Sequence, residues 1–151
     1  MFCNIEIGAS FTMETDPFGT FIASSFSYAS ARDWALFGQL YLNDGVWEGK
    51  RLFPEGWVKY TTTPTKNSFN LYGSHWWLGG ADKLVPSILE EVQQLYSSFE
   101  KGTYLASGYG GQFTVVVPQH NLVFTRLGFT PAKNESFPIS EVVKKVLEVL
   151  K

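Results

Sequence analysis

The sequence is poor in the residue types that form disulfides and metal sites. Cys3 is the one cysteine among 151 residues, so no disulfide can form within the chain. The two histidines, His75 and His120, lie far apart, and neither is at helical or hairpin ligand spacing from a Cys, an Asp or the other His. We therefore expect neither a metal ion nor another cofactor.

Neither sign of charge dominates, and long apolar runs are absent. Twelve basic against fourteen acidic residues give a formal net charge of -2 without a basic stripe, which argues against a nucleic-acid partner. No apolar run approaches the roughly 20 residues that cross a bilayer. The N-terminus also lacks the basic and apolar regions of a signal peptide.

Aromatic and apolar residues are abundant instead. Hydrophobic residues make up 44% of the chain and aromatic residues 17%, which predicts a packed globular body. We expect most of the aromatic rings to lie in the core. Because the sequence has no internal repeat and no linker, residues 1–151 are expected to form one domain-sized unit.

The clearest helix signal begins at Ser30. Ser30 is a good N-cap residue, and Asp33 three positions later comes close to a capping box. Apolar residues then recur at three- and four-residue steps until Gly45 ends the helix. Residues 1–29, which precede this signal, are expected to be irregular or extended because they carry turn residues and no helical period.

The rest of the chain alternates between turn residues and short apolar segments. We expect a turn over residues 46–50, a short helix opening at Pro54, a loop over residues 61–70, an aromatic strand over residues 71–78, a helix capped by Ser87 and Glu90 that runs to about residue 101, strands over residues 104–107, 112–117 and 122–128 with a four-residue loop between the last two, and a terminal helix after Pro138. Helices followed by strands and a closing helix predict an α+β fold, with an antiparallel sheet and flanking helices.

Two segments of the chain resemble a known family. They run from Ser30 to Val58 and from Tyr104 to Pro118. In this order they resemble the serine β-lactamase-like hydrolases, which comprise penicillin-binding proteins, class C β-lactamases and related esterases and amide hydrolases. The resemblance implies the C-terminal part of a β-lactamase/transpeptidase-like fold. Residues 1–151 would then be a single partial domain without the part that bears the nucleophile.

The second segment also implies a candidate site. In this family a sheet strand with Lys-Thr-Gly, or a His-Gly-like replacement, borders the active site and gives a backbone N–H to the oxyanion. If Ala106-Ser107-Gly108 stands at that triplet, the donor is the Tyr109 N–H, which is the register we favour. If Tyr109-Gly110-Gly111 does, the donor is the Gln112 N–H.

Four neighbours of these two donors are expected to contact substrate, namely Ser107, Gly108, Gly110 and Gly111. Glycine suits such a strand, because a missing side chain lets a substrate approach the backbone. The structural alternative is that these glycines only form a tight corner between strands. Neither register contains a lysine, so the resemblance favours an esterase or amidase over an enzyme for carboxylate-bearing β-lactams.

The family's catalytic motifs are expected to lie outside this sequence. The nucleophile of the family is the serine of a Ser-x-x-Lys motif at a helix start, and a Tyr-x-Asn motif assists proton transfer. Ser98-Phe99-Glu100-Lys101 fits the first motif by letter, but it lies at the end of an expected helix. Tyr41-Leu42-Asn43 fits the second but closes the helix that begins after Ser30. We interpret both as chance matches.

The sequence therefore predicts the C-terminal part of a β-lactamase-related serine hydrolase that acts on small-molecule esters or amides through an acyl-enzyme. The chain by itself is expected to be inactive. The alternative is a non-catalytic binding or assembly protein derived from the same fold. Half a sheet exposes strand edges and apolar faces, so the isolated chain is expected to self-associate in that case.

Overall fold

A computed structural model describes residues 2–5, 9–22, 25–80, 90–131 and 137–150. It contains nine strands, four α-helices and one 3₁₀ turn within these ranges. In chain order they are β1 (Phe2–Ile5), β2 (Ala9–Met13), β3 (Ser27–Tyr28), α1 (Ala31–Leu42), β4 (Val46–Trp47), β5 (Lys50–Arg51), α2 (Trp57–Thr61), β6 (Trp77–Leu78), α3 (Glu90–Ser97), β7 (Tyr104–Gly108), β8 (Gln112–Val117), η1 (Pro118–His120), β9 (Leu122–Arg126) and α4 (Ile139–Val149).

The main sheet is antiparallel, with the strand order β6-β7-β8-β9. Its centre is the β7–β8 hairpin, in which Leu105 lies opposite Val115. β8 and β9 form a second hairpin closed by η1, where Asn121 takes a left-handed conformation with φ 50°. The predicted four-residue connection between these two strands is therefore confirmed.

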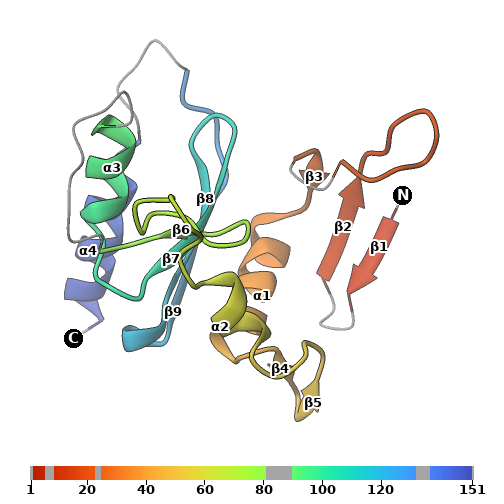
Figure 1. Ribbon diagram of the computed structural model, residues 1–151, viewed down its shortest axis with the longest axis horizontal. Coiled ribbons are helices and arrows are strands. Elements are labelled where there is room, and N and C mark those ends of the chain that lie inside the picture. Colours follow the sequence, from red (N-terminus) through yellow and green to blue (C-terminus); the bar gives the residue numbers. More distant parts are fainter. Residues whose placement is uncertain (1, 6–8, 23–24, 81–89, 132–136, 151) are drawn as a thin grey trace.

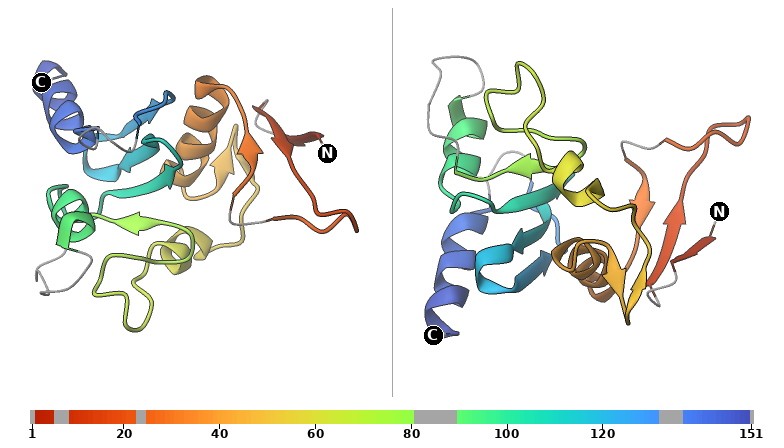
Figure 2. Two further views of the ribbon diagram at one scale, coloured as in Figure 1. Left: turned by 90° about the horizontal axis from the view of Figure 1, so that it is seen from above. Right: turned by 60° about the horizontal axis from the view of Figure 1, so that its bottom comes forward.

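The two faces of this sheet belong to different cores, because successive side chains of a strand point to opposite faces. On one face Leu105, Phe113 and Val115 pack with residues of α3 and α4, such as Tyr96 and Val143. On the other face, Tyr104 and Val116 pack with Tyr41 of α1. Figure 2 shows α3 and α4 on the side of the sheet away from α1.

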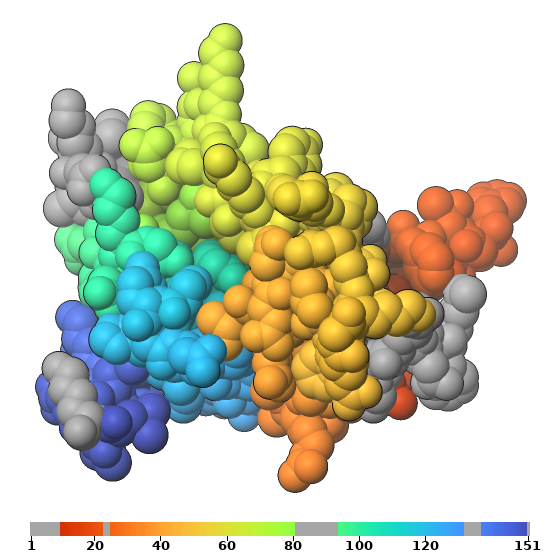
Figure 3. Space-filling view, turned by 90° about the horizontal axis from the view of Figure 1, so that it is seen from below, coloured from red at the N-terminus to blue at the C-terminus, as the bar shows by residue number. Residues whose placement is uncertain are grey.

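Helix α1 begins as the sequence predicts. The Ser30 hydroxyl accepts a hydrogen bond from the Asp33 N–H, and the Asp33 carboxylate accepts one from the Ser30 N–H, which completes a capping box. Gly38 lets the helix approach the sheet, because a Cβ there would lie 2.7 Å from a methyl of Val123. In the space-filling view of Figure 3, α1 lies directly against β9.

Residues at the N-terminus form a small separate sheet, of order β1-β2-β3. The expectation that residues 1–29 are irregular or extended agrees with the described part of this range, but the antiparallel pairing of β2 with β1 and β3 has no clear sequence signal. This sheet lies at one end of the molecule, on the far side of α1 from the main sheet (Figure 1). Phe11 of β2 attaches it to α1 through an edge-on contact with Trp34, at 4.9 Å between ring centroids.

Some of the predicted elements differ from the structure, and one cannot be compared with it. The aromatic strand is limited to β6, because a turn precedes it in which the Gly73 N–H donates to the Trp76 carbonyl and His75 has φ 66°. Helix α2 begins at Trp57 and not at Pro54, whose carbonyl instead closes a turn by accepting from the Trp57 N–H. The predicted cap at Ser87 lies outside the described residues, and α3 is described from Glu90 onward.

Candidate functional site

The β7–β8 corner has a backbone conformation that requires glycine. Strand β7 ends at Gly108, which lies opposite Gln112 at the start of β8. Between them, Gly110 and Gly111 have φ of 73° and 76°, values that other residues rarely adopt. A Cβ on Gly110 would also lie 2.7 Å from a ring carbon of Phe129. The structural alternative from the sequence, a tight corner, is therefore a correct description of the backbone.

The corner lies next to an open strand edge. Strand β6 pairs only with Tyr104 and Leu105 of β7. In the described part of the chain, residues 106–108 have β8 on one side and no strand on the other. Ser107 and Gly108 are exposed there.

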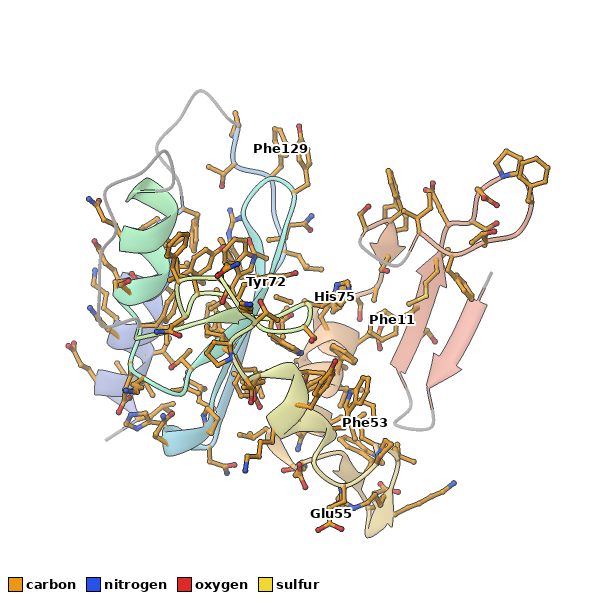
Figure 4. All side chains as sticks on the ribbon, in the orientation of Figure 1. Phe11, Phe53, Glu55, Tyr72, His75 and Phe129 are labelled. Atoms are coloured by element: carbon orange, nitrogen blue, oxygen red, sulfur yellow. The ribbon has the colours of Figure 1, made fainter. Side chains whose placement is uncertain are left out.

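Tyr109 is exposed at the corner. Within the described residues, its N–H donates no hydrogen bond, while its carbonyl accepts one from Gln112 Nε2 at 3.0 Å. The Tyr109 side chain is 85% exposed and lies 5.9 Å from the ring of Phe129, between centroids. Figure 4 shows Phe129 at this end of the sheet, remote from Phe53 and Glu55. The two rings therefore lie together at the corner.

Ser107 is held by a residue of α3. Burial raises the pKa of the Tyr96 hydroxyl, and the side-chain hydrogen bond with Ser107 acts in the opposite direction. Tyr96 is itself fixed by stacking on Trp77, at 4.4 Å between ring centroids. The Ser107 side chain is therefore anchored toward the helix, while its backbone stays accessible at the edge of β7.

Sequence reasoning did not assign Arg126 to the corner, nor the Phe129 ring described above. Arg126 ends β9, and its guanidinium donates to the carbonyls of Gly111 and Gly128. The available signal was a single charged residue in a strand that is mostly apolar. Such a cation has to find acceptors when it is partly buried.

The structure does not give Ser98 the surroundings of a nucleophile. It follows the last residue of α3, and its hydroxyl donates to the Leu95 carbonyl at 2.6 Å. The match to the Tyr-x-Asn motif is also part of a helix terminus, because Tyr41 is buried and Asn43 caps the end of α1.

The two histidines lie away from the corner. His75 is exposed in the turn before β6 and makes no hydrogen bond among the described residues. His120 lies in η1, where its Nε2 is 2.9 Å from the Glu100 carboxylate.

A cavity of about 420 Å³ lies at the other end of β8. Val117, the last residue of β8, lines it together with Val143 and Leu147 of α4, and so do His120 and Glu100. Among the described residues, no three His, Cys, Asp or Glu side chains gather as a metal site requires. Within the same ranges no helix has the length and apolarity of a membrane span.

Comparisons with known proteins relate the chain to one type of fold. No protein-family model matches the sequence. An uncharacterised protein of Alkalihalophilus pseudofirmus is 28% identical over 123 residues, which are 78% of this chain and 34% of that protein. Among solved structures, a Bacillus anthracis protein named "Putative 6-aminohexanoate-dimer hydrolase" is similar with a TM-score of 0.62 and 23% identity, over 95% of this chain and 34% of that one.

The likeness to the solved structure shows the fold. The chain spans about a third of the length of both proteins. The predicted fold class is confirmed: the chain is α+β, with an antiparallel sheet flanked by helices. Its likeness to about a third of a hydrolase-named structure is consistent with the C-terminal part of a β-lactamase-like fold.

Proposed function

We propose that the β7–β8 corner is the oxyanion-binding wall of a β-lactamase-related serine hydrolase that acts on esters or amides through an acyl-enzyme. The observation that carries this proposal is the Tyr109 N–H, which has no partner among the described residues and lies beside an open strand edge. The fold shared with a protein named as a hydrolase supports it.

The chemistry needs a backbone donor at this point. Attack of a nucleophile on an ester or amide carbonyl places negative charge on the carbonyl oxygen, and a fixed N–H lowers the energy of that state. The Tyr109 N–H is available for this role, while Gln112 belongs to β8. Residues 106–112 carry no charged side chain, which suits a neutral substrate better than one with a carboxylate.

The nucleophile, in this proposal, comes from a region of the family fold that precedes the segments found here. Two experiments address this point. Mass spectrometry of the native protein should identify any peptides upstream of Met1 that carry Ser-x-x-Lys and Tyr-x-Asn motifs. In parallel, the 151-residue chain should not hydrolyse nitrophenyl esters or anilides. Turnover that Ser98→Ala abolishes would instead identify Ser98 as the nucleophile.

The role of Tyr109 predicts a backbone-specific effect in the active native protein. Tyr109→Pro removes the N–H and should lower kcat for a nitrophenyl ester by about 100- to 1,000-fold, the usual loss for one oxyanion donor. Tyr109→Ala keeps the N–H and is the matched control, expected to retain kcat within about tenfold. Equal losses in both variants would contradict the donor role and point to the ring instead.

A second candidate function, a non-catalytic binding or assembly protein, is favoured by the exposed aromatic side chains. Phe18 is 94% exposed at the tip of the N-terminal sheet, where the Asp16 carboxylate holds the turn by accepting from the Phe18 N–H at 2.9 Å. Exposed rings of this kind are typical of contact surfaces.

This candidate predicts that the isolated chain self-associates. Sedimentation velocity should then show species larger than the 17.0 kDa monomer, in proportions that rise with concentration. Phe18→Ser should reduce the association. Phe53→Ser is the control, because it changes a residue packed against the core and shows how general destabilisation alters the association. A monomer at all concentrations that unfolds cooperatively would contradict the assembly role.

A further inference from the structure

We infer that Arg126 is the positioning residue of the β7–β8 corner: its guanidinium fixes the glycine turn and thereby the direction of the Tyr109 N–H. This inference rests on the proposed function for its catalytic meaning. The contacts that the guanidinium makes with the corner can be tested without measuring enzymatic activity.

The guanidinium contacts four groups at once. Nη1 donates to the Gly111 carbonyl and, at 3.0 Å, to the Gly128 carbonyl. Nη2 donates to the Thr130 hydroxyl at 3.1 Å. The flat face of the group lies over the Phe137 ring, with Cζ 4.0 Å from the ring centroid. These contacts leave little rotational freedom to the side chain, although it starts from the edge strand β9.

Through these contacts Arg126 restrains both glycines of the turn. It holds the Gly111 carbonyl directly. It also orients Thr130, whose backbone N–H donates to the Gly110 carbonyl at 2.8 Å. Two glycines in succession have a large number of accessible backbone states, so a turn built on them needs such external restraints to hold one conformation.

An arginine suits this task better than a lysine. Its planar group presents five N–H donors in a rigid fork and can bind several acceptors while its face stacks on an aromatic ring. A lysine ammonium is a point charge that cannot reach the Gly111 and Thr130 oxygens and also cover Phe137. A donor that is fixed before the reaction stabilises an oxyanion without the cost of reorganisation.

The test measures amide hydrogen exchange in the 151-residue chain carrying Arg126→Met or Arg126→Lys. We expect the Thr130 amide to exchange at least about tenfold faster in both variants, with Val115 in the centre of β8 unchanged. Arg51→Met is the matched control, because Arg51 also bonds to backbone carbonyls, those of Asp44 and Phe53, but far from the corner. It should leave Thr130 unchanged.

Two outcomes would overturn the inference. One is unchanged exchange at Thr130 in both Arg126 variants. The other is an equal rise at Thr130 and Val115, which would mean that Arg126 supports the whole sheet and not the corner. Neither outcome depends on catalysis. The inference about Arg126 can therefore fail while Tyr109→Pro still lowers kcat, and it can hold while Tyr109→Pro has no effect on kcat.

In the active native protein, a positioning role also predicts a specific kinetic pattern. Arg126→Met should lower kcat with little change in KM, because the donor acts in the transition state more than in binding. Added guanidinium ion should restore part of kcat in Arg126→Met and none in Tyr109→Pro. A purely structural arginine would not give this difference.

Discussion

Leu105→Ala is expected to lower the free energy of unfolding by about 2–5 kcal/mol, the usual range for a fully buried leucine. Leu105 is 0% exposed in the middle of β7, with Val115 opposite on one neighbouring strand and Trp77 on the other. Its side chain belongs to the core that α3 and α4 cover. Because these neighbours come from several elements, they cannot all move to fill the space that the missing methyl groups leave.

Urea denaturation followed by far-UV circular dichroism measures this loss as a lower midpoint with an unchanged slope. Leu150→Ala makes the same chemical change at the end of α4, where the side chain is 66% exposed, and should cost less than about 0.5 kcal/mol. Similar midpoints for the two variants would contradict the position of Leu105 in the core.

Trp76→Ala should destabilise the opposite face of the sheet by about 3–5 kcal/mol. The Trp76 side chain is 2% exposed. Its ring lies 4.6 Å from that of Tyr41 and 5.1 Å from that of Tyr104, and it stacks on Phe37 at 6.2 Å, all between centroids. The Trp76 ring joins α1 to the sheet. Its loss should therefore weaken the packing of α1 on the sheet as well as lower the urea midpoint.

The matched control for this variant is Trp57→Ala. Trp57 begins α2, is 40% exposed and has one described ring contact, with Tyr60 at 5.8 Å. We expect a loss below about 1 kcal/mol there. Near-UV circular dichroism should fall mainly in Trp76→Ala, because Trp76, unlike Trp57, is fixed among several rings. A larger loss of stability in Trp57→Ala than in Trp76→Ala would contradict the position of Trp76 in the aromatic core.

Local signals in the sequence were sufficient for much of the fold. The capping box at Ser30 and Asp33 and the apolar residues of α1 are read directly from residue spacing, and so are β8 and the η1 connection. The N-terminal sheet was missed because its pairing joins segments without a hairpin signature. The strand over residues 71–78 was overestimated because aromatic content hides the turn at His75.

The candidate site was predictable only in part. A glycine-rich corner after an apolar strand identifies residues 107–112, and the structure adds the two left-handed glycines and the open edge of β7. Arg126 and Phe129 could not be assigned to this corner from spacing, since they are more than ten residues from Tyr109 along the chain. They reach it because β9 pairs with β8 and the chain then turns back over the corner.

The alternation of β8 between two cores has an evolutionary consequence. Substitutions between apolar residues of similar size at Val115 or Val116 leave each side chain on its own face, whereas one inserted or deleted residue transfers every following side chain to the opposite face. Natural variants of this protein should therefore exchange similar apolar residues within β8 but keep its length constant. Length changes should accumulate instead in the exposed turns, such as the one around Phe18.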